Sequence, residues 1–420
     1  MNNNNYEIRD INLAASGRRR IEWVKRNMPL LRALEDEYGG LPEESKPFHG
    51  VKISLSIHLE PKTAYLCEVL RAAGATMAVT GSNVLSTQDA TAAALAANGI
   101  AVFAVHGESE SDYFRHLEMT LEHKPNIVID DGGDLLSILH DKRPDLASEV
   151  WGGCEETTTG VIRMKALAKE GKLRFPMVAV NDARCKHLFD NRYGTGQSVW
   201  GSLMSNTNLI VASKTAVVAG YGWCGRGIAL RASALGASVI VTEIDPVKAI
   251  EARMDGYSVM PMKDAATLGD FFITATGCKD VITMEHMALM KDGAILGNAG
   301  HFNVEIDMES IDKEAAEIFD ARENVKGYRL ASGNTVFIIA EGRLLNIAAA
   351  DGHPAEIMDM SFAVQFHSAM YILKNRETLP LSVIDVSDET DIAIAKGKLR
   401  AWGLELDKLT EEQEQYLNSF

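Results

Sequence analysis

Residues 215–227 read TAVVAGYGWCGRG, an apolar run that enters a turn with three glycines, Gly220, Gly222 and Gly225. A helix-compatible stretch follows, and a second apolar run then ends at Glu243, 18 residues beyond Gly225. Strand, glycine turn, helix and spaced acid together are typical of a dinucleotide-binding βαβ unit, with the phosphates at the helix N-terminus. A carboxylate at Glu243 accepts hydrogen bonds from ribose hydroxyls and repels a 2′-phosphate, so the pattern favours NAD over NADP. The alternative is a glycine-bearing turn that binds no ligand.

Upstream of this unit, the chain alternates short apolar runs with helical stretches. We expect strands at 51–59, 76–80, 100–105 and 126–129, and helices at 63–73, 87–98 and 109–123, with Ser86 or Thr87 as the N-cap of the second helix. This alternation predicts a parallel, doubly wound sheet. Ligands of such sheets bind beyond the carboxyl ends of the strands, which directs attention to residues such as His58, Ser86 and the group 130–134.

The predicted fold class is α/β, with two doubly wound parallel-sheet domains and a small C-terminal segment. A second alternating series runs from about 215 to 299, after a polar crossover at 186–208. A strand near 335–342, a helix near 354–373 and a short terminal helix near 409–416 follow. We therefore expect a substrate domain at 1–185, an NAD domain at 186–350, a return segment at 351–390 and an oligomerisation segment at 391–420.

The composition is that of a folded globular chain of 420 residues, 46% hydrophobic and 24% charged, with a net charge of −16. A chain this acidic is a poor candidate for binding nucleic acid or an anionic membrane. No apolar run approaches the ~20 residues that span a bilayer, and the N-terminus shows no signal peptide. The five cysteines lack zinc-ligand spacing, so no metal is expected and a cytoplasmic location is predicted.

Three polar clusters indicate acid–base chemistry. Residues 127–135 (IVIDDGGDL) place three carboxylates at the end of a buried strand, and 154–160 (CEETTTG) add two more. Lys186 and Asp190 stand one helical turn apart, with Asn191 alongside. Carboxylates gathered beside a lysine suit acid–base work on a polyhydroxylated substrate, because neighbours set each pKa. Taken singly, each cluster could also be a helix cap or a solvated surface pair.

Together these motifs closely resemble those of the S-adenosylhomocysteine hydrolase family. The matching stretches run from about residue 10 to residue 417 and include SIHLEPKTA, NVLSTQD, IVIDDGGDL, EETTTGV, KHLFDNRYGTGQS, VVAGYGWCGRG, VTEIDP, TATGC, GNAGHFNVEID, AEGRLLNIAAADGHP and MDMSF. The resemblance implies a Rossmann NAD domain, one tightly bound NAD per subunit and a homotetramer. It also implies reversible cleavage of S-adenosyl-L-homocysteine to adenosine and L-homocysteine, by 3′-oxidation, β-elimination, water addition and re-reduction.

The resemblance also implies roles for individual residues. Asp131 corresponds to the base at C4′, Lys186 and Asp190 to the pair at the ribose hydroxyls, and His58 and His301 to residues near C5′ and sulfur. With Glu156 on the ribose hydroxyls, these six are the implied catalytic residues. The implied substrate contacts are Glu60, Lys62, Thr63, Ser86, Asp134, His353, Met358 and Phe362. The implied NAD contacts are Thr157, Thr158, Thr159, Asn191, Gly220, Gly222, Gly225, Glu243, Thr276, Asn298 and Asn346.

The chain departs from the family pattern next to the first histidine. Many members carry Thr-x-Glu-Thr where this chain has Glu60-Pro61-Lys62-Thr63, and that glutamate accepts from the adenine 6-amino group. Lysine cannot accept a hydrogen bond and instead suits a 6-oxo group, so S-inosyl-L-homocysteine is an alternative substrate. The competing expectation is that Lys62 turns to solvent or pairs with Glu60.

Two further departures affect the cofactor site. The chain ends at Phe420, without the longer tail in which a Lys and a Tyr of many members reach a neighbouring subunit's NAD, and Thr195 replaces a common cysteine. Other functional classes stay open from sequence: an NAD-dependent dehydrogenase for 2-hydroxy acids, and a non-catalytic NAD-binding scaffold. The dehydrogenase alternative predicts a substrate site without the Asp131, Lys186 and Asp190 set.

Overall fold

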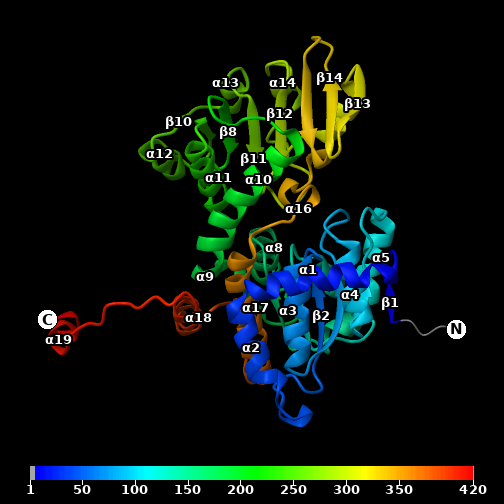
Figure 1. Cartoon of the computed structure of the whole chain (residues 1–420), viewed down its shortest axis with the longest axis vertical. Coiled ribbons are helices and arrows are strands. Elements are labelled where there is room, and N and C mark those ends of the chain that lie inside the picture. Colours follow the sequence, from blue (N-terminus) through cyan, green and yellow to red (C-terminus); the bar gives the residue numbers. More distant parts are fainter. Residues whose placement is uncertain (1–4, 420) are drawn as a thin grey trace.

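In a computed structural model that describes residues 5–419, the chain forms two α/β bodies and an extended C-terminal arm (Figure 1). The first body contains an eight-stranded sheet in which every pair is parallel. Its strands, in spatial order, are β1 (Tyr6–Glu7), β4 (Ala101–Phe103), β3 (Thr76–Thr80), β2 (Lys52–Ser56), β5 (Ile127–Asp130), β6 (Gly152–Glu155), β7 (Met177–Ala179) and β16 (Val383–Asp385).

Helices cover both faces of this sheet, as a doubly wound fold requires (Figure 1). They are α1 (Ala14–Arg26), α2 (Pro29–Gly39), α3 (Pro61–Ala72), α4 (Asp89–Ala97), α5 (Glu110–Leu121), α6 (Asp134–Ser137), α7 (Pro144–Ala147), α8 (Thr158–Lys169), α9 (Arg184–Lys186), α17 (Ala355–Asn375) and α18 (Asp388–Ala401). The strands and helices bury a continuous apolar core that includes Leu55, Val79, Leu95, Phe362 and Phe366. Helix α17 returns from the far end of the sequence to pack in this core, which brings residues 355–375 beside the first body's strands.

The second body contains the glycine-rich turn. Its sheet has the order β10 (Ser258–Val259), β9 (Ser238–Thr242), β8 (Thr215–Ala219), β11 (Phe271–Thr274), β12 (Ala294–Asn298), β15 (Thr335–Ile339), β14 (Val325–Arg329) and β13 (Glu317–Arg322). The helices are α10 (Thr195–Thr207), α11 (Trp223–Ala234), α12 (Pro246–Met254), α13 (Met262–Ala266), α14 (Met284–Met287), α15 (Met308–Glu314) and α16 (Leu345–Ala348). The predicted parallel order runs from β10 to β15, and β14 and β13 extend the sheet beyond β15 in antiparallel pairing.

Several helical segments are irregular. Two π-helical stretches span Ile138–Lys142 and His187–Gly194, and short 3-10 turns span Ile11–Leu13, Glu43–Ser45, Val180–Asp182 and Ala340–Gly342.

The predicted N-cap of α4, Ser86 or Thr87, is wrong. The helix begins at Asp89 after Gln88, which makes no side-chain cap, while Ser86 Oγ donates to the carbonyl of Asn83. No described helix is both long and apolar enough to cross a membrane.

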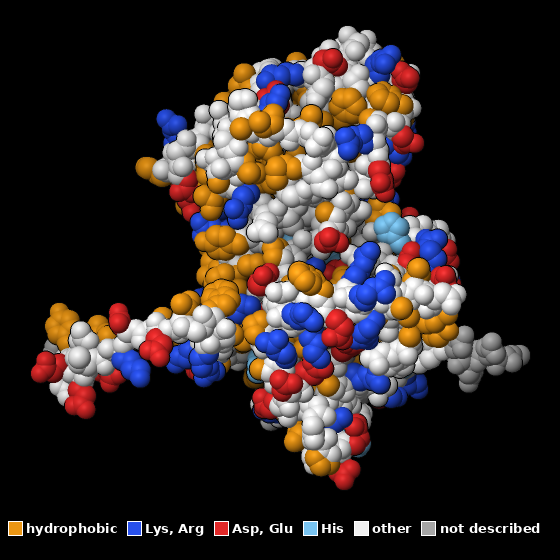
Figure 2. Space-filling model, viewed as in Figure 1, with side chains coloured by type: hydrophobic (Ala, Val, Ile, Leu, Met, Phe, Trp, Pro, Cys, Tyr) orange, Lys and Arg blue, Asp and Glu red, His pale blue; other side chains and the backbone are white. Residues whose placement is uncertain are grey.

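The C-terminal arm follows α18 and ends in α19 (Glu411–Asn418), which stands away from both bodies (Figures 1 and 2). Its apolar side chains are uncovered: more than half of each side chain is exposed at Leu404, Leu406, Leu409, Tyr416 and Leu417. Uncovered apolar side chains on an extended segment are unusual in an isolated chain and are typical of contacts with another molecule.

Candidate active site

A cavity of about 1410 Å³ lies between the two bodies and is lined by residues of both. The first body contributes the loops that follow β2, β5 and β6, and the second contributes those that follow β8, β9, β11 and β12. The carboxyl ends of the central strands of both sheets therefore open into one space, the position that parallel α/β sheets use for ligands.

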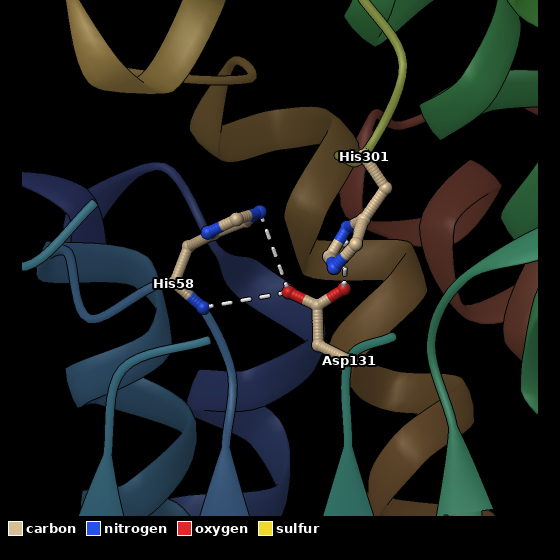
Figure 3. Close-up of side chains that lie close together, drawn as sticks. All are labelled: His58, Asp131 and His301. Atoms are coloured by element: carbon tan, nitrogen blue, oxygen red, sulfur yellow. Dashed lines mark hydrogen bonds and ion pairs between the residues drawn. The ribbon is translucent and has the colours of Figure 1, made fainter. Parts of the chain in front are cut away.

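Three side chains meet at the junction of the two bodies (Figure 3). Asp131 Oδ2 lies 3.5 Å from His58 Nε2, and Asp131 Oδ1 lies 3.9 Å from His301 Nδ1. One ligand-type atom from each of the three falls within 4.8 Å of the others. His58 and Asp131 belong to the first body and His301 to the second, so this cluster exists only when the bodies are together.

The surroundings of Asp131 favour its ionised form. Burial opposes ionisation, but His58, His301, a hydrogen bond from Ser82 and Lys186 outweigh it and hold the pKa of Asp131 below its usual range. Burial, followed by electrostatic interaction with His301 and His353, outweighs the attraction of Asp131 and lowers the pKa of His58 to about 4. At neutral pH the site therefore presents a buried carboxylate beside a neutral imidazole, which is the arrangement of a base beside a proton relay.

A second cluster surrounds Lys186, whose Nζ lies 3.5 Å from Asp190 Oδ2 and 3.6 Å from Glu156 Oε1. Lys186 Nζ also donates to Asn191 Oδ1 at 2.8 Å, and Asn181 Oδ1 accepts from both Lys186 and Asn191. The π-helical stretch 187–194 sets the spacing of Lys186, Asp190 and Asn191. Such π-helical turns occur frequently at functional sites.

Charges in this cluster differ from group to group. Despite the cost of burial, Asp190 and Glu156 raise the pKa of Lys186, and Lys186 and His353 lower the pKa of Asp190. Burial raises the pKa of Glu156 to about 8, even though Lys186 lies close to it. At neutral pH the cluster therefore holds an ammonium, a carboxylate and a neutral carboxylic acid, so groups that donate and groups that accept protons lie side by side.

The side of the cavity that the resemblance assigns to the purine base contains a charged pair. Lys62 Nζ lies 2.7 Å from Glu60 Oε2, and it donates to the carbonyl of Asp351 at 2.8 Å. Only 6% of each of the two side chains is exposed. Lys62 thus pairs with Glu60 inside the cavity and does not turn to solvent. Thr63, His353, Met358 and Phe362 line the same cavity.

His353 connects this side to the Lys186 cluster. Its Nδ1 lies 2.8 Å from Asp190 Oδ1, and Ser361 donates to Asp190 Oδ2. Thr195 Oγ1 lies 3.3 Å from His353 Nε2 and 3.7 Å from the thiol of Cys224. The position where family members commonly have a cysteine therefore has a thiol beside it, contributed by residue 224.

The glycine-rich turn fits a dinucleotide. A Cβ on Gly220 would lie 2.7 Å from the Ala275 carbonyl, and one on Gly225 would lie 1.9 Å from the Gly220 carbonyl. Gly222 faces open space, so a diphosphate can approach its backbone there. Glu243 lines the cavity at the end of β9, and backbone amides of Tyr221, Ile244 and Asp245 hold its carboxylate.

A buried acceptor elsewhere in the same space also fits a cofactor. Asn346 Oδ1 is buried and has no hydrogen-bond partner among residues 5–419, while its amide donates to Ser198. A buried acceptor without a donor is costly, and a bound carboxamide would satisfy it. Thr157, Thr158, Thr159, Asn191 and Thr276 line the cavity nearby.

Four of the sequence-predicted residues do not line the cavity. Gly225 packs the helix against its turn, and Asn298 organises the loop at 300–302 through bonds to backbone groups. Ser86 is buried against Asn83. Asp134 bonds to Arg163 and Tyr113 behind the loop that holds Asp131. The other predicted site residues line the cavity.

Several polar neighbours were missed from sequence. Ser82 donates to Asp131 Oδ2 at 2.9 Å, and Gln365 donates to Glu156. Glu305 accepts from Thr276 and Gly277, and Asn181 and Ser361 hold the Lys186 cluster as described above. Glu305 and Ser361 lie within the quoted stretches GNAGHFNVEID and MDMSF, and Asn181 lies just before the Lys186 motif. Ser82 and Gln365 lie outside all of these, and only the fold brings them to the site.

One contact joins the two bodies beside Asp131. The Arg163 guanidinium lies 4.6 Å from the centre of the Phe302 ring and donates to the Gly132 carbonyl at 2.7 Å. A Cβ on Gly132 would lie 2.2 Å from His301 Nε2. The loop at 301–302 of the second body therefore packs directly on the loop that carries Asp131.

Comparisons with known proteins agree with this geometry. Residues 5–148 match the family model described as S-adenosyl-L-homocysteine hydrolase, and residues 191–352 match the model of that family's NAD binding domain. The chain is 53% identical to the S-inosyl-L-homocysteine hydrolase of Methanocaldococcus jannaschii, over 99% of both chains. It is 52% identical to an adenosylhomocysteinase of Pyrococcus abyssi, covering 99% of this chain and 97% of the relative. It is 54% identical to that of Thermotoga maritima, covering 96% and 99%.

The glycine turn with Glu243, the histidine–carboxylate cluster and the Lys186 cluster all fall within or between the two matched regions, apart from His353. The chain belongs to the S-adenosyl-L-homocysteine hydrolase family, and its second body is the NAD-binding domain of that family.

Proposed function

We propose that the chain catalyses the reversible hydrolysis of S-adenosyl-L-homocysteine, or of its 6-oxo counterpart S-inosyl-L-homocysteine, to the nucleoside and L-homocysteine. The observation that carries this proposal is the meeting of Asp131, His58 and His301 across the two bodies, with the Lys186 cluster in the same cavity. A dehydrogenase for 2-hydroxy acids has no use for this second set of carboxylates and a lysine.

NAD held by the glycine turn, Glu243 and Asn346 would supply a reversible hydride acceptor for C3′ of the ribose, and oxidation there would make the C4′ hydrogen acidic. Lys186 and Asp190 bind the 3′-hydroxyl and move its proton, since one carries a positive and the other a negative charge at neutral pH. Glu156, with its pKa near 8, donates a hydrogen bond to the neighbouring hydroxyl.

Asp131 acts as the base at C4′, because its carboxylate stays ionised inside the cavity. His58 and His301 flank Asp131 and pass protons to the leaving sulfur, and then take them from the water that adds at C5′. The Arg163–Phe302 contact supports closure of the bodies over this site, which keeps bulk water from a reactive ketone.

Lys62 pairs with Glu60, as one half of the competing expectation has it, but the pair is buried in the cavity lining, and this placement supports the 6-oxo base. The resemblance places residue 62 opposite the 6-substituent of the purine, and there the ammonium of Lys62 can donate to an oxygen but cannot accept from an amino group. Glu60 beside it accepts from the N1–H of hypoxanthine. We therefore propose that inosine is preferred over adenosine as the nucleoside.

The test is turnover of purified protein with homocysteine and either nucleoside, followed by chromatography without added NAD. The thioether of inosine should form faster than that of adenosine, and NAD should copurify at one per subunit. Thioether formation only after NAD is supplied would overturn the tight binding, and none at all would overturn the proposed activity.

We further propose the domain boundaries 1–185, 186–350, 351–390 and 391–420, a homotetramer and a cytoplasmic location. Two separate sheets with separate cores support the division. The uncovered apolar arm at 403–418 supports assembly, and so do the exposed side chains of Val247, Ile250 and Met254 on α12. The five cysteines are all unpaired, which supports a reducing compartment.

A further inference from the structure

Two buried carboxyl groups lie directly behind the proposed base and have no part in the chemistry described above. Asp130 ends β5, Glu155 ends β6, and the two are paired opposite each other in the parallel sheet. Both are 0% exposed, and neither lines the cavity, so neither touches substrate or cofactor. Buried carboxyl groups are costly, and a pair of them at this position calls for an explanation.

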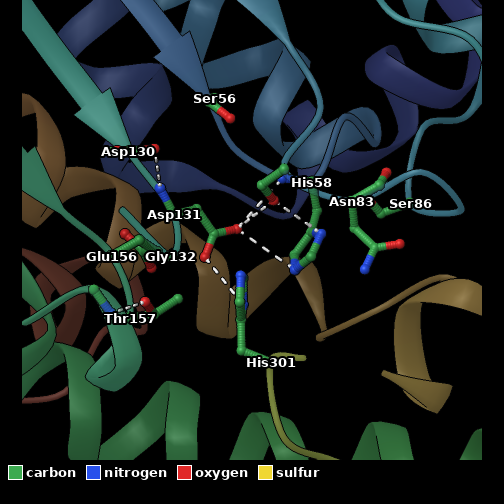
Figure 4. A network of polar contacts seen from close by, with 12 residues as sticks. Ser56, His58, Asn83, Ser86, Asp130, Asp131, Gly132, Glu156, Thr157 and His301 are labelled. Carbon is green, nitrogen blue, oxygen red and sulfur yellow. Dashed lines mark hydrogen bonds and ion pairs between the residues drawn. The ribbon is translucent and has the colours of Figure 1, made fainter. Parts of the chain in front are cut away.

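Both groups bind the backbone of the loop that carries Asp131, and Figure 4 shows the bond from the Asp131 amide to Asp130. Asp130 Oδ1 accepts the amide of Asp131 at 3.1 Å, and its Oδ2 accepts the amide of Leu136 at 2.8 Å. Glu155 Oε1 accepts the amide of Gly132 at 2.9 Å. The two successive amides at 131 and 132 are thus each held from behind by a carboxyl oxygen.

Glu155 also connects this loop to the next one. The same Oε1 atom accepts from the Thr157 amide and the Thr157 hydroxyl, both at 2.8 Å. Thr157 belongs to the proposed NAD contacts, and its hydroxyl caps α8 by accepting from Gly160. One buried oxygen therefore fixes the loop of the base relative to the loop that faces the cofactor.

The loop requires such an anchor because its sequence alone does not select one shape. Gly132 and Gly133 have φ values of +109° and +81°, a region that glycine enters freely along with many others. The space around Glu155 is closely fitted, since a Cβ on Gly160 would lie 2.0 Å from Glu155 Cδ. A side chain of a different length at 155 would therefore lose these bonds.

The hydrogen bonds that hold the loop do not require a negative charge on Glu155. Burial and the neighbouring Asp130 raise the pKa of Glu155 well above its usual range, and burial raises the pKa of Asp130 to about 7. Glu155 Oε2 is buried and has no partner among the described residues. A proton on Oε2 leaves Oε1 free to accept its three hydrogen bonds, so a neutral side chain of the same length can do the same.

We infer that Glu155, together with Asp130, is a positioning residue that holds Asp131 at C4′ through the backbone of the 131–133 loop. The inference rests on the proposed function, because it assigns Asp131 as the base. It predicts that activity depends on the length of the side chain at 155 and on its acceptor oxygen, and does not depend on its negative charge. Glu155→Gln should therefore be tolerated better than Glu155→Asp.

The test compares Glu155→Gln, Glu155→Asp and the exposed control Glu170→Gln in the full-length holoenzyme. The readouts are kcat, KM for the nucleoside, NAD per subunit, hydrogen exchange of the 130–136 amides, and exchange of the nucleoside C4′ hydrogen in D₂O. Glu155→Gln and Glu170→Gln should stay within threefold of the parent chain. Glu155→Asp should lose at least tenfold in kcat and in C4′ exchange, with KM within threefold, unchanged NAD content and faster amide exchange.

Two results would overturn the inference: a Glu155→Gln protein as impaired as Glu155→Asp, or a Glu155→Asp protein with parental kcat and amide protection. If Glu155→Asp does not fold, the Glu155→Gln result alone decides, because loss of activity there shows that charge matters. If the parent chain forms no thioether, the proposed function fails, and the amide exchange of 130–136 still tests the anchoring separately.

Discussion

Exchanging the Glu60–Lys62 pair for the family's Thr-x-Glu pattern should reverse the preferred base. Lys62 is almost fully buried and already donates to Glu60 and Asp351, which leaves one ammonium hydrogen for the ligand. If an adenine 6-amino group faces the Lys62 ammonium, two donors meet and neither has an acceptor. An unsatisfied buried polar group costs about 1–3 kcal/mol, which corresponds to about 5- to 150-fold in kcat/KM.

The double variant Glu60→Thr/Lys62→Glu avoids placing two carboxylates side by side. The assay measures kcat/KM for inosine and for adenosine with homocysteine, in the parent chain, in the double variant and in Lys172→Glu. Lys172 is 68% exposed, and its substitution lowers the net charge by two outside the cavity, against one for the double variant. The parent and Lys172→Glu should prefer inosine, and the double variant should prefer adenosine.

A parent chain that prefers adenosine, with a ratio the double variant leaves unchanged, would refute this reasoning. That result would mean that Glu60 accepts from the 6-amino group while Lys62 donates to N1, so that the pair reads adenine in the reverse order. An inosine preference that survives the double variant would place base selection elsewhere, in the 352–362 region.

Three further changes test other parts of the site. Asp131→Asn should leave the rise in absorbance at 340 nm on nucleoside addition intact and lower C4′ exchange at least ~100-fold, since general bases contribute about 10²–10⁴-fold; equal loss of both signals would contradict its assignment. Glu156→Gln should flatten the pH dependence of stability in urea unfolding. The unfolded carboxyl ionises near pH 4.5 and the folded one near 8, so the folded parent retains a proton between them and its free energy of unfolding falls by roughly 4–5 kcal/mol as pH rises; an unchanged slope would argue against this pKa. Arg163→Met should remove a cation–π contact worth about 0.5–2 kcal/mol and raise KM for the nucleoside about 2- to 30-fold, whereas an unchanged KM would mean that closure does not depend on Phe302.

Local patterns predicted the central elements of the fold well. The run 76–80 is a strand with those bounds, and the glycine turn that begins at Gly220 leads from β8 into α11, with Gly225 in the first turn of the helix. Edge strands were missed, because β1 and β16 are short and pair with strands far along the chain. Strand β13 was missed as well: its residues 317–322 are largely exposed, and it lacks the apolar run that identifies a buried strand.

The reactive residues of the site could be found from sequence, but the residues that orient them could not. Asp131 and Lys186 lie in dense polar motifs that resemble a known family. Ser361 and Gln365 occupy an apolar helix, α17, and their partners Asp190 and Glu156 lie 171 and 209 residues away. No local signal marks such a hydrogen bond, because it depends on how α17 returns to the first body.

The most direct test of a redox-cycling hydrolase is the absorbance of the purified protein at 340 nm after addition of inosine or adenosine, followed by homocysteine, with no NAD added. The absorbance should rise with the nucleoside and fall when homocysteine is added, because thioether formation returns the hydride to C3′, with the thioether of inosine as the main product. A protein that gives no absorbance change and no thioether, even with NAD supplied, would contradict the proposed hydrolase activity. The non-catalytic NAD-binding scaffold would then be the alternative that remains.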